Sequence, residues 1–315
     1  MQNLGTLAQY TLLSIKDQES FGIYYSARDN ETNINYIIYI QNAQNNNNNI
    51  PANEINILNL LNNSNNPYIL HCVNHGNGQL ILNNQPPRNA FYIVYENAQN
   101  YLLYDYMRLG GLGENRAKLL FKKIVLGIQA IHNANICHRD IMTESIYLDD
   151  NYNPKIFNFG FSSLNAGNLQ EYLGSEGHAA PEILAHHPYN GFKLDIFNLG
   201  QLLFILVNGI FGFTSARNTD IYYNLIMLNN YDEYWHNQRF QNLNLSNSFK
   251  DLYLRMVSYQ PNERPTIDEI LNSPWLQDIN NLNQQQILDL ENEIIQELHN
   301  REAQIQNLRN QEMNI

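Results

Sequence analysis

The sequence has little of what marks several large protein classes. Cysteine occurs only at Cys72 and Cys137, without metal-type spacing, which fits buried thiols in a reducing compartment. Positive charge is also scarce, and a formal net charge of -12 argues against nucleic acid or an anionic membrane as the main partner. The chain does not begin with a basic region followed by an apolar one, so we expect no signal peptide and a cytoplasmic protein.

Long hydrophobic runs and clusters of metal ligands are missing as well. The longest apolar run, residues 199–213, is too short for a membrane span and is interrupted by Asn208 and Gly209, which predicts a buried helix. The close histidine pairs have no convergent carboxylates or cysteines, so no metal site is predicted. These pairs are His71 with His75, and His186 with His187.

What is present divides the chain into a β-rich part and a helical part. The length allows two packed lobes, and a hydrophobic content of 43% is ordinary for a globular protein. Pro51 is expected to open a helix, and from Glu114 onward apolar residues recur at helical spacing. The predicted strands are residues 10–15, 22–27, 34–40, 79–82 and 91–95.

The stretch from Asn283 to Asn310 contains no glycine or proline and has a heptad-like repeat. This pattern fits a short coiled coil, through which the chain can form a homodimer or bind a protein partner. It also fits an amphipathic helix packed on its own domain. The repeat positions, alternately four and three residues apart, hold Ile287, Glu291, Ile294, Leu298, Arg301, Ile305 and Leu308.

A series of short motifs carries a family resemblance. In order along the chain they are His138-Arg139-Asp140, Asn158-Phe159-Gly160, Ala180-Pro181-Glu182, Asp195 to Gly200, and Glu263-Arg264-Pro265. They strongly resemble the catalytic loop, the magnesium-binding motif and the following landmarks of eukaryotic protein kinases. Gly174-Ser175 and residues 189–193 are most similar to the group of calmodulin-dependent and AMP-activated kinases.

This resemblance implies an α+β fold with two lobes. The expected divisions are a lead-in (residues 1–9), a β-rich small lobe (10–96), a helical large lobe (97–276) and a C-terminal amphipathic or coiled-coil helix (277–315). Residues 91–96 resemble the strand that leads into the connection between the lobes.

The positions that bind ATP phosphates in this family are altered. Gly22 matches the third glycine of the glycine-rich loop, but Asp17 and Glu19 stand at the first two, where a side chain and a negative charge repel phosphate. Tyr39 takes the place of the phosphate-binding lysine, which leaves its acidic partner, matched by Glu54, without an ion pair. Lys16 precedes the altered loop and is the alternative source of a cation.

The catalytic positions are altered as well. Asp140 keeps the place of the residue that orients the substrate hydroxyl. Met142 replaces the phosphate-contacting lysine, and Ser145 and Asn158 replace the two metal ligands. A neutral amide removes the charge that makes a magnesium site strong, so little magnesium affinity is expected.

Large side chains are expected to fill the adenine position. By the same resemblance the wall residues are Tyr24, Ile37, Tyr95, Tyr147 and Phe157, with Tyr95 at the gatekeeper position. Because protein interiors pack densely, we predict a filled pocket; the alternative is that some of these side chains rotate away.

Residues that support the family's architecture are kept. Glu182 and Arg264 match a buried ion pair, and Asp195 matches an acceptor for the amides of the catalytic loop. A hydrophobic spine between the lobes is matched by Leu58, Cys72, His138 and Phe159. Arg139 either reads a phosphate on Ser162, Ser163 or Ser175, or bonds local carbonyl groups.

The combination indicates a pseudokinase that acts as a scaffold or allosteric partner of other proteins, with no cofactor expected. ATP and magnesium enter only under alternative readings. These are an atypical active Ser/Thr kinase that uses Asp140, a nucleotide-binding switch without catalysis, and a component of a larger assembly docked through the C-terminal helix.

Overall fold

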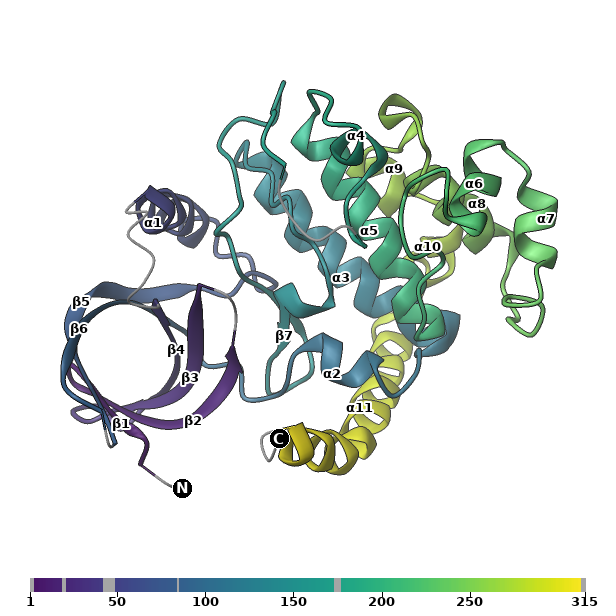
Figure 1. Cartoon of the computed structure of the whole chain (residues 1–315). Helices are drawn as coiled ribbons and strands as arrows, with labels where there is room; N and C mark the ends of the chain where they lie inside the picture. The colour runs from purple at the N-terminus through teal and green to yellow at the C-terminus, as the bar shows by residue number, and fades with distance from the viewer. Residues whose placement is uncertain (1–2, 19–20, 42–48, 84, 173–176, 313–315) are drawn as a thin grey trace.

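The chain folds into two lobes that lie side by side, a β-barrel with one helix and a larger bundle of helices (Figure 1). This computed structural model describes residues 3–18, 21–41, 49–83, 85–172 and 177–312. Glu19, Gly174 and Ser175, which the sequence analysis singled out, lie outside these ranges. The predicted bilobal α+β architecture is confirmed.

The small lobe is a closed barrel of antiparallel strands in the order β1-β2-β3-β4-β6-β5. The strands are β1 (Gly5–Leu7), β2 (Tyr10–Gln18), β3 (Gly22–Asp29), β4 (Asn35–Gln41), β5 (Cys72–Leu82) and β6 (Arg88–Tyr95). Alternate residues fill the barrel, with Leu12, Ile38 and Val94 fully buried. This core is separate from the main hydrophobic core of the molecule.

Two boundaries in the small lobe differ from the prediction. Residues 1–9 were expected as a lead-in, but β1 pairs with both β2 and β5 and so closes the barrel. A strand of this length is too short to show alternation in sequence. β5 starts well before the predicted residue 79, because pairing with β6 supplies its hydrogen bonds across glycine- and asparagine-rich sequence.

Helix α1 (Asn49–Asn62) lies beside the barrel and begins just before Pro51. Its predicted inward positions Leu58 and Leu61 are buried, whereas Ile55 is only partly buried against the main core. The helix contacts β5, and its buried leucines belong to the main core and not to the core of the barrel.

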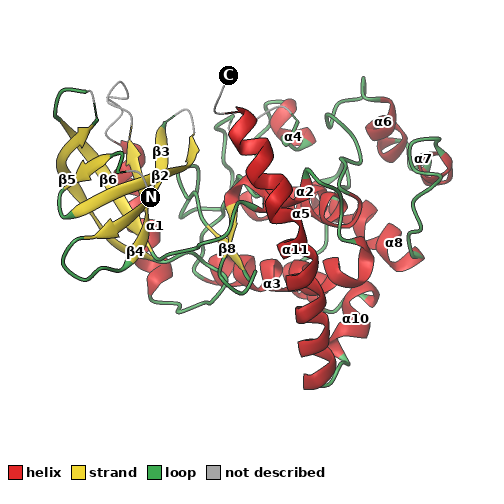
Figure 2. Ribbon diagram, turned by 90° about the horizontal axis from the view of Figure 1, so that it is seen from below, coloured by secondary structure: helices red, strands yellow, loops and turns green. Residues whose placement is uncertain are grey.

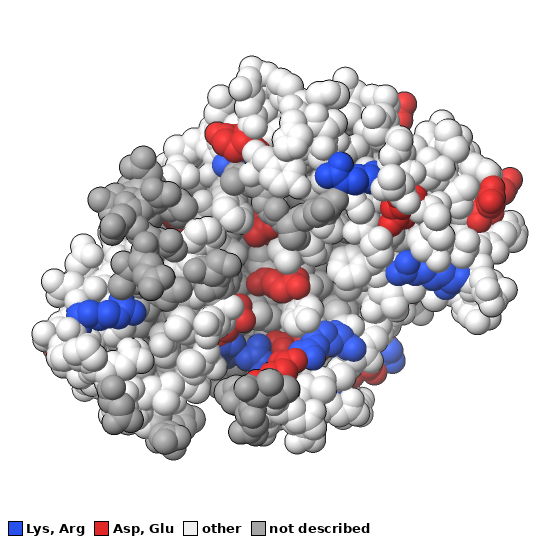
Figure 3. Space-filling view, in the orientation of Figure 1, with Lys and Arg blue, Asp and Glu red and all other residues white. Residues whose placement is uncertain are grey.

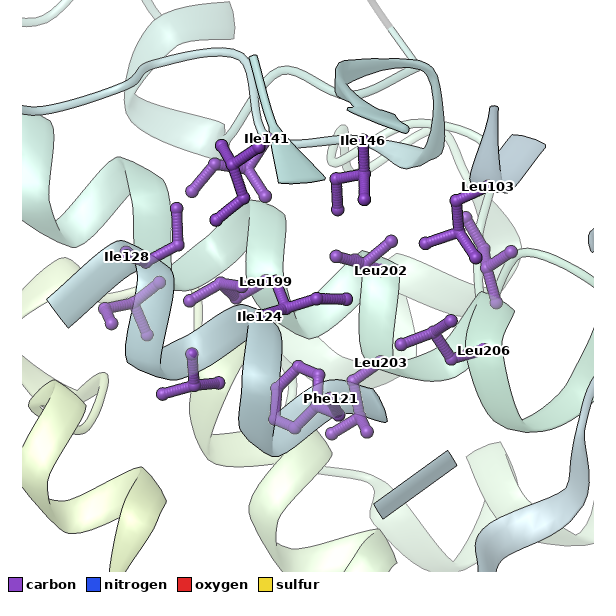
Figure 4. Packing of buried hydrophobic residues seen from close by; sticks show 14 of the residues in the cluster. Leu103, Phe121, Ile124, Ile128, Ile141, Ile146, Leu199, Leu202, Leu203 and Leu206 are labelled. Carbon is purple, nitrogen blue, oxygen red and sulfur yellow. The ribbon is translucent and has the colours of Figure 1, made fainter. Parts of the chain in front are cut away.

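The large lobe is built around two long helices, α3 (Gly113–Asn133) and α5 (Gly191–Asn208), whose leucine and isoleucine side chains interdigitate (Figure 4). Short elements surround them: α2 (Leu103–Met107), η1 (Thr143–Ser145), β7 (Ile146–Leu148), β8 (Pro154–Ile156), α4 (Pro181–Leu184), α6 (Ile221–Met227), α7 (Tyr231–His236), α8 (Asn247–Met256), η2 (Pro261–Glu263), α9 (Ile267–Leu271) and α10 (Pro274–Asn280). The main core includes the labelled residues Phe121, Ile128 and Leu202.

Helix α5 covers part of the longest apolar run. It is long and apolar enough to cross a membrane by length and composition, but 83% of that stretch is buried inside the structure, as in the core helix of a globular domain. The predicted buried helix is therefore present, with one correction. It ends at Asn208 because Gly209 adopts a left-handed φ of 69°, and Ile210 and Phe211 beyond it are partly exposed.

The C-terminal helix α11 (Gln284–Glu312) lies along the large lobe and crosses α2 and α3 (Figure 2). Its repeat positions Ile294, Leu298 and Ile305 are buried in the main core. The structure thus has the amphipathic helix packed on its own domain, the second of the two interpretations of the repeat. Homodimer formation through residues 283–310 stays a prediction.

Candidate active site between the lobes

At the position where the resemblance predicts the phosphate-binding lysine, the ring of Tyr39 lies against a glycine. Tyr39 of β4 pairs with Tyr24 of β3, and their ring centroids are 4.9 Å apart. A Cβ atom added to Gly22 would lie 2.3 Å from the Tyr39 ring. Gly22 therefore leaves room for the Tyr39 ring, which gives this glycine a packing role.

Aromatic rings from both lobes meet where the adenine pocket was predicted. Tyr147 of β7 stacks on Phe157, which follows β8, with ring centroids 4.5 Å apart. Tyr24 from the small lobe meets Phe157 edge-on at 5.3 Å. Tyr24 is 2% exposed, and Ile37, Tyr147 and Phe157 are 0% exposed. The predicted wall residues thus pack against one another across the two lobes.

Glu54 of α1 points into the protein and pairs with the gatekeeper tyrosine. The Tyr95 hydroxyl donates a hydrogen bond to Oε1 of Glu54 at 3.3 Å, and the Phe159 amide donates a second one. Among the described residues Glu54 forms no ion pair, and its carboxylate accepts these two hydrogen bonds instead. Burial raises the pKa of Glu54 to about 7, because water no longer solvates the carboxylate.

Lys16 lies on the connection between the lobes. Its ammonium group donates to the backbone carbonyl oxygens of Ala98, Gln99 and Asn100 at 3.0, 2.7 and 3.0 Å. It also lies 5.8 Å from the centroid of the Tyr147 ring. The sequence left this lysine as an alternative source of a cation for phosphates, and its donors are engaged by the connecting segment.

The catalytic loop is held by a buried carboxylate, as predicted. Asp195 accepts the amide of His138 at 2.9 Å and the amide of Arg139 at 2.7 Å. Asp140 follows them and is half-buried. Burial raises the pKa of Asp140 to about 6, and the neighbouring Glu144 and Asp195 add to this shift.

Ser145 and Asn158, which stand at the two positions predicted for metal ligands, differ in their surroundings. The buried Ser145 hydroxyl accepts the Met142 amide and donates to the Met142 carbonyl, both at 3.0 Å, so it closes the turn of η1. Asn158 adopts a left-handed φ of 65°, which asparagine tolerates better than most residues. No group of three or more His, Cys, Asp or Glu side chains suited to a metal occurs in the described ranges.

The supporting groups named from the sequence come together. Arg264 forms a bidentate ion pair with Glu182, with both nitrogen–oxygen distances at 2.7 Å and both residues buried. His138 and Phe159 are in ring contact at 5.1 Å. Leu58 and Cys72 are buried in the main core, to which Phe159 also belongs.

Arg139 bonds groups near the loop. Its Nε donates to the Phe161 carbonyl at 2.5 Å, and its Nη1 lies 3.1 Å from Glu171 and 3.2 Å from the Tyr189 hydroxyl. This agrees with the interpretation that it bonds local groups. Glu171 was not identified from the sequence, since an isolated glutamate in a loop carries no signal of its partner.

Sequence reasoning also missed a residue of α11 that reaches the site. Arg309 forms a fork with buried Asp105 of α2, at 2.6 and 3.1 Å, and donates to the backbone carbonyl of Lys16 at 2.6 Å. Figure 3 shows basic and acidic side chains intermixed where the end of α11 meets the space between the lobes. Nothing in the spacing of residues so distant in the chain could indicate this contact.

A two-lobed fold with a carboxylate-held catalytic loop defines the class of the protein. A family model of the protein kinase domain matches residues 18–276. The chain therefore belongs to the protein kinase domain family, which confirms the resemblance. The relatives described next also support its place in the group of calmodulin-dependent and AMP-activated kinases.

Three curated relatives illustrate the similarity. Probable serine/threonine-protein kinase MARK-A of Dictyostelium discoideum is 32% identical over 59% of this chain and 17% of its own length. CBL-interacting serine/threonine-protein kinase 15 of Arabidopsis thaliana is 28% identical over 60% of this chain and 44% of its own. Serine/threonine-protein kinase SIK1 of Rattus norvegicus is 31% identical over 66% and 26%. The chain thus spans less than half the length of each of these relatives.

Proposed function

We propose that this kinase domain is a pseudokinase, which works by binding other proteins and does not transfer phosphate. One observation carries the proposal: aromatic side chains from both lobes pack together at the place where the family resemblance puts the nucleotide base. Tyr24, Tyr147 and Phe157 are at most 2% exposed and in ring contact. A base can enter only if these rings leave a densely packed interior.

Lys16 adds a second obstacle to a base. An adenine that binds the connection between the lobes needs backbone groups of that segment as hydrogen-bond partners. Three carbonyl groups of the segment already accept the Lys16 ammonium at 2.7–3.0 Å. A base that bonds one of these three carbonyl groups competes with a charge-assisted interaction, which is roughly twice as strong as a neutral hydrogen bond.

The residues at the positions expected to bind phosphate and metal also support the absence of phosphate transfer. Met142 has no charge for a phosphate, and the Ser145 hydroxyl is buried and bonded on both sides to the Met142 backbone. Asn158 is a neutral amide, which is a weak ligand for a hard dication in the absence of carboxylates. These residues do not fit a strong magnesium site, so we derive no catalytic step through that ion.

The test is a thermal-shift titration of the purified chain with ATP, with and without magnesium. A ligand at about a hundred times its dissociation constant stabilises a fold by about 2.7 kcal/mol, which is a shift of several degrees. We expect no shift up to millimolar nucleotide. A shift that requires magnesium would refute the proposal, and a shift indifferent to magnesium would indicate a nucleotide-binding switch.

An atypical active kinase is the second candidate, and Asp140 is the observation that favours it. The loop that carries Asp140 is held in place by Asp195, and the raised pKa of Asp140, about 6, suits a general base near neutral pH. The assay is transfer of labelled phosphate to a mixture of protein substrates. Transfer that the Asp140→Asn variant abolishes would establish this candidate, since that variant controls for a contaminating kinase.

The proposal includes a protein partner. The acidic net charge favours a protein over nucleic acid. Self-association through residues 283–310 can be measured by sedimentation of the full chain and of the Leu288→Asp variant, because Leu288 is exposed on α11. A dimer that this variant leaves intact would show that the helix is not the contact.

A further inference from the structure

We propose that Lys16 and Arg309 form a latch between the lobes, and that the end of α11 is the part that can release it. The inference goes beyond the proposed function, because it concerns how the lobes are held and stands whether or not a nucleotide binds. It rests on contacts that join one strand of the small lobe to two places on the rest of the molecule.

The first half of the latch is the side chain of Lys16. From β2 it reaches the connection between the lobes, where the three donors of its ammonium group meet three carbonyl oxygens at 2.7–3.0 Å. Burial and the nearby Arg309 lower the pKa of Lys16 to about 8, so the group remains charged at neutral pH. This half holds the strand to the connecting segment.

The second half is Arg309, near the end of α11. Its fork to Asp105 anchors the guanidinium group on α2 of the large lobe, and the group lies 5.1 Å from the Tyr101 ring centroid. The remaining nitrogen, Nη1, donates to the backbone carbonyl of Lys16 at 2.6 Å. The same residue of β2 is therefore held through its side chain and through its backbone.

The rest of α11 is anchored to the large lobe by other contacts. Arg301 donates to the backbone carbonyls of Tyr106, Gly110 and Gly111 at 2.5–3.0 Å. Lys123 of α3 pairs with Glu291 at 2.7 Å, and Ile294 and Leu298 are buried beside it. Ile305, one turn before Arg309, is also buried in the main core. The last two turns of the helix, residues 306–312, can therefore detach while the part up to Ile305 stays docked.

Other contacts between the lobes do not involve α11. The Phe21 ring meets Phe161 edge-on at 6.4 Å, and the Asn53 amide donates to the Ser162 carbonyl at 3.0 Å. The ion pair that would tie α1 to β4 is missing, since Tyr39 replaces the lysine and Glu54 pairs with Tyr95. Loss of the latch should therefore loosen β2 and the connection without unfolding either lobe.

The test is amide hydrogen exchange of the full chain. Arg309→Met keeps much of the apolar stem but removes the fork and the bond to Lys16. We expect exchange to rise by about tenfold or more in β2 and in residues 96–102, with α3 and residues 284–300 unchanged. Lys16→Met should raise exchange in the same two segments. Unchanged exchange in β2 for both variants would overturn the latch.

Arg108→Met is the matched control. Arg108 pairs with Glu312 on the same end of α11 at 2.7 Å, but this pair lies within the large lobe. It should leave β2 protected, and an equal rise in β2 would overturn the assignment to Arg309. If Arg309→Met does not fold, Arg309→Lys replaces it. That variant keeps the charge but not the fork, so it should loosen β2 less, and wild-type protection there would refute the proposal.

Discussion

Two regions of the molecule are stabilised by different interactions. One is the set of groups behind the catalytic loop, and the other is the set of side chains between the lobes. Behind the loop, charged side chains are buried and fully bonded, as in Glu182 with Arg264 and in Asp195 with the loop amides. In the cleft, Tyr24, Tyr147 and Phe157 fill the interior by packing. Under the proposed function, the architecture of a kinase persists while the surface that would face a nucleotide is part of the core.

The largest loss of stability is expected when the buried ion pair behind the catalytic loop is broken. Arg264→Met leaves Glu182 buried without its partner, which should lower the free energy of unfolding by roughly 3–5 kcal/mol. Urea denaturation measures this change. Arg116→Met is the control, because Arg116 lies 4.0 Å from Glu293 in an exposed ion pair. A pair of that kind contributes about 1 kcal/mol at most. Equal losses of unfolding free energy in the two variants would contradict the stronger role of the buried ion pair.

The second largest effect is expected among the aromatic rings packed between the lobes. Phe157→Ala removes a ring that is stacked on Tyr147 and should destabilise the chain by about 3–4 kcal/mol, the lost burial plus the cavity left behind. An apolar cavity of this kind can bind a small aromatic molecule. We expect indole to raise the melting temperature of the variant but not of the wild type. No stabilising effect of indole would show that the neighbouring rings collapse into the space.

The buried carboxyl group of Glu54 should make the free energy of unfolding depend on pH. The pKa of Glu54 is raised from 4.5 to about 7, so the folded state binds this proton more tightly than the unfolded state. Its contribution to stability is present below pH 4.5 and is lost as the pH rises through 7. The loss is at most roughly 3 kcal/mol, at about 1.4 kcal/mol per pKa unit.

Glu54→Gln should remove this dependence, since an amide does not ionise and its oxygen can still accept the Tyr95 hydroxyl. Chemical denaturation of both proteins from pH 5 to 8 measures the difference. Asp140 also has a raised pKa, but it titrates in both proteins and cancels in the comparison. Parallel pH profiles would mean that Glu54 is ionised at no cost.

The smallest expected effect is at Gly22. An added Cβ meets the Tyr39 ring, so Gly22→Ala should cost about 1–3 kcal/mol through overpacking. In a Tyr39→Leu background the same change should cost much less. A double-mutant cycle with all four proteins measures this coupling, and an absent coupling energy would show that the ring moves aside freely.

Much of the fold could be predicted because its signals are local. The motif around Asp140 and the apolar periodicity of α3 are readable over short stretches. The strand β1 was missed because its pairing partners, β2 and β5, supply the information that three residues cannot. At the site, the resemblance named Tyr39, Glu54 and Tyr95, but nothing in the sequence predicted the hydrogen bond that joins Tyr95 to Glu54.

By itself the sequence determined the family and the division into a β-rich and a helical lobe, since these are properties of short motifs and periodicities. Only the tertiary structure decided what the ambiguous groups contact. Lys16 lies on the carbonyls of the connecting segment, and the repeat of α11 packs on its own lobe. Arg309 meets Lys16 across nearly the whole chain. Such contacts depend on where the folded backbone brings distant residues together, which spacing along a chain cannot express.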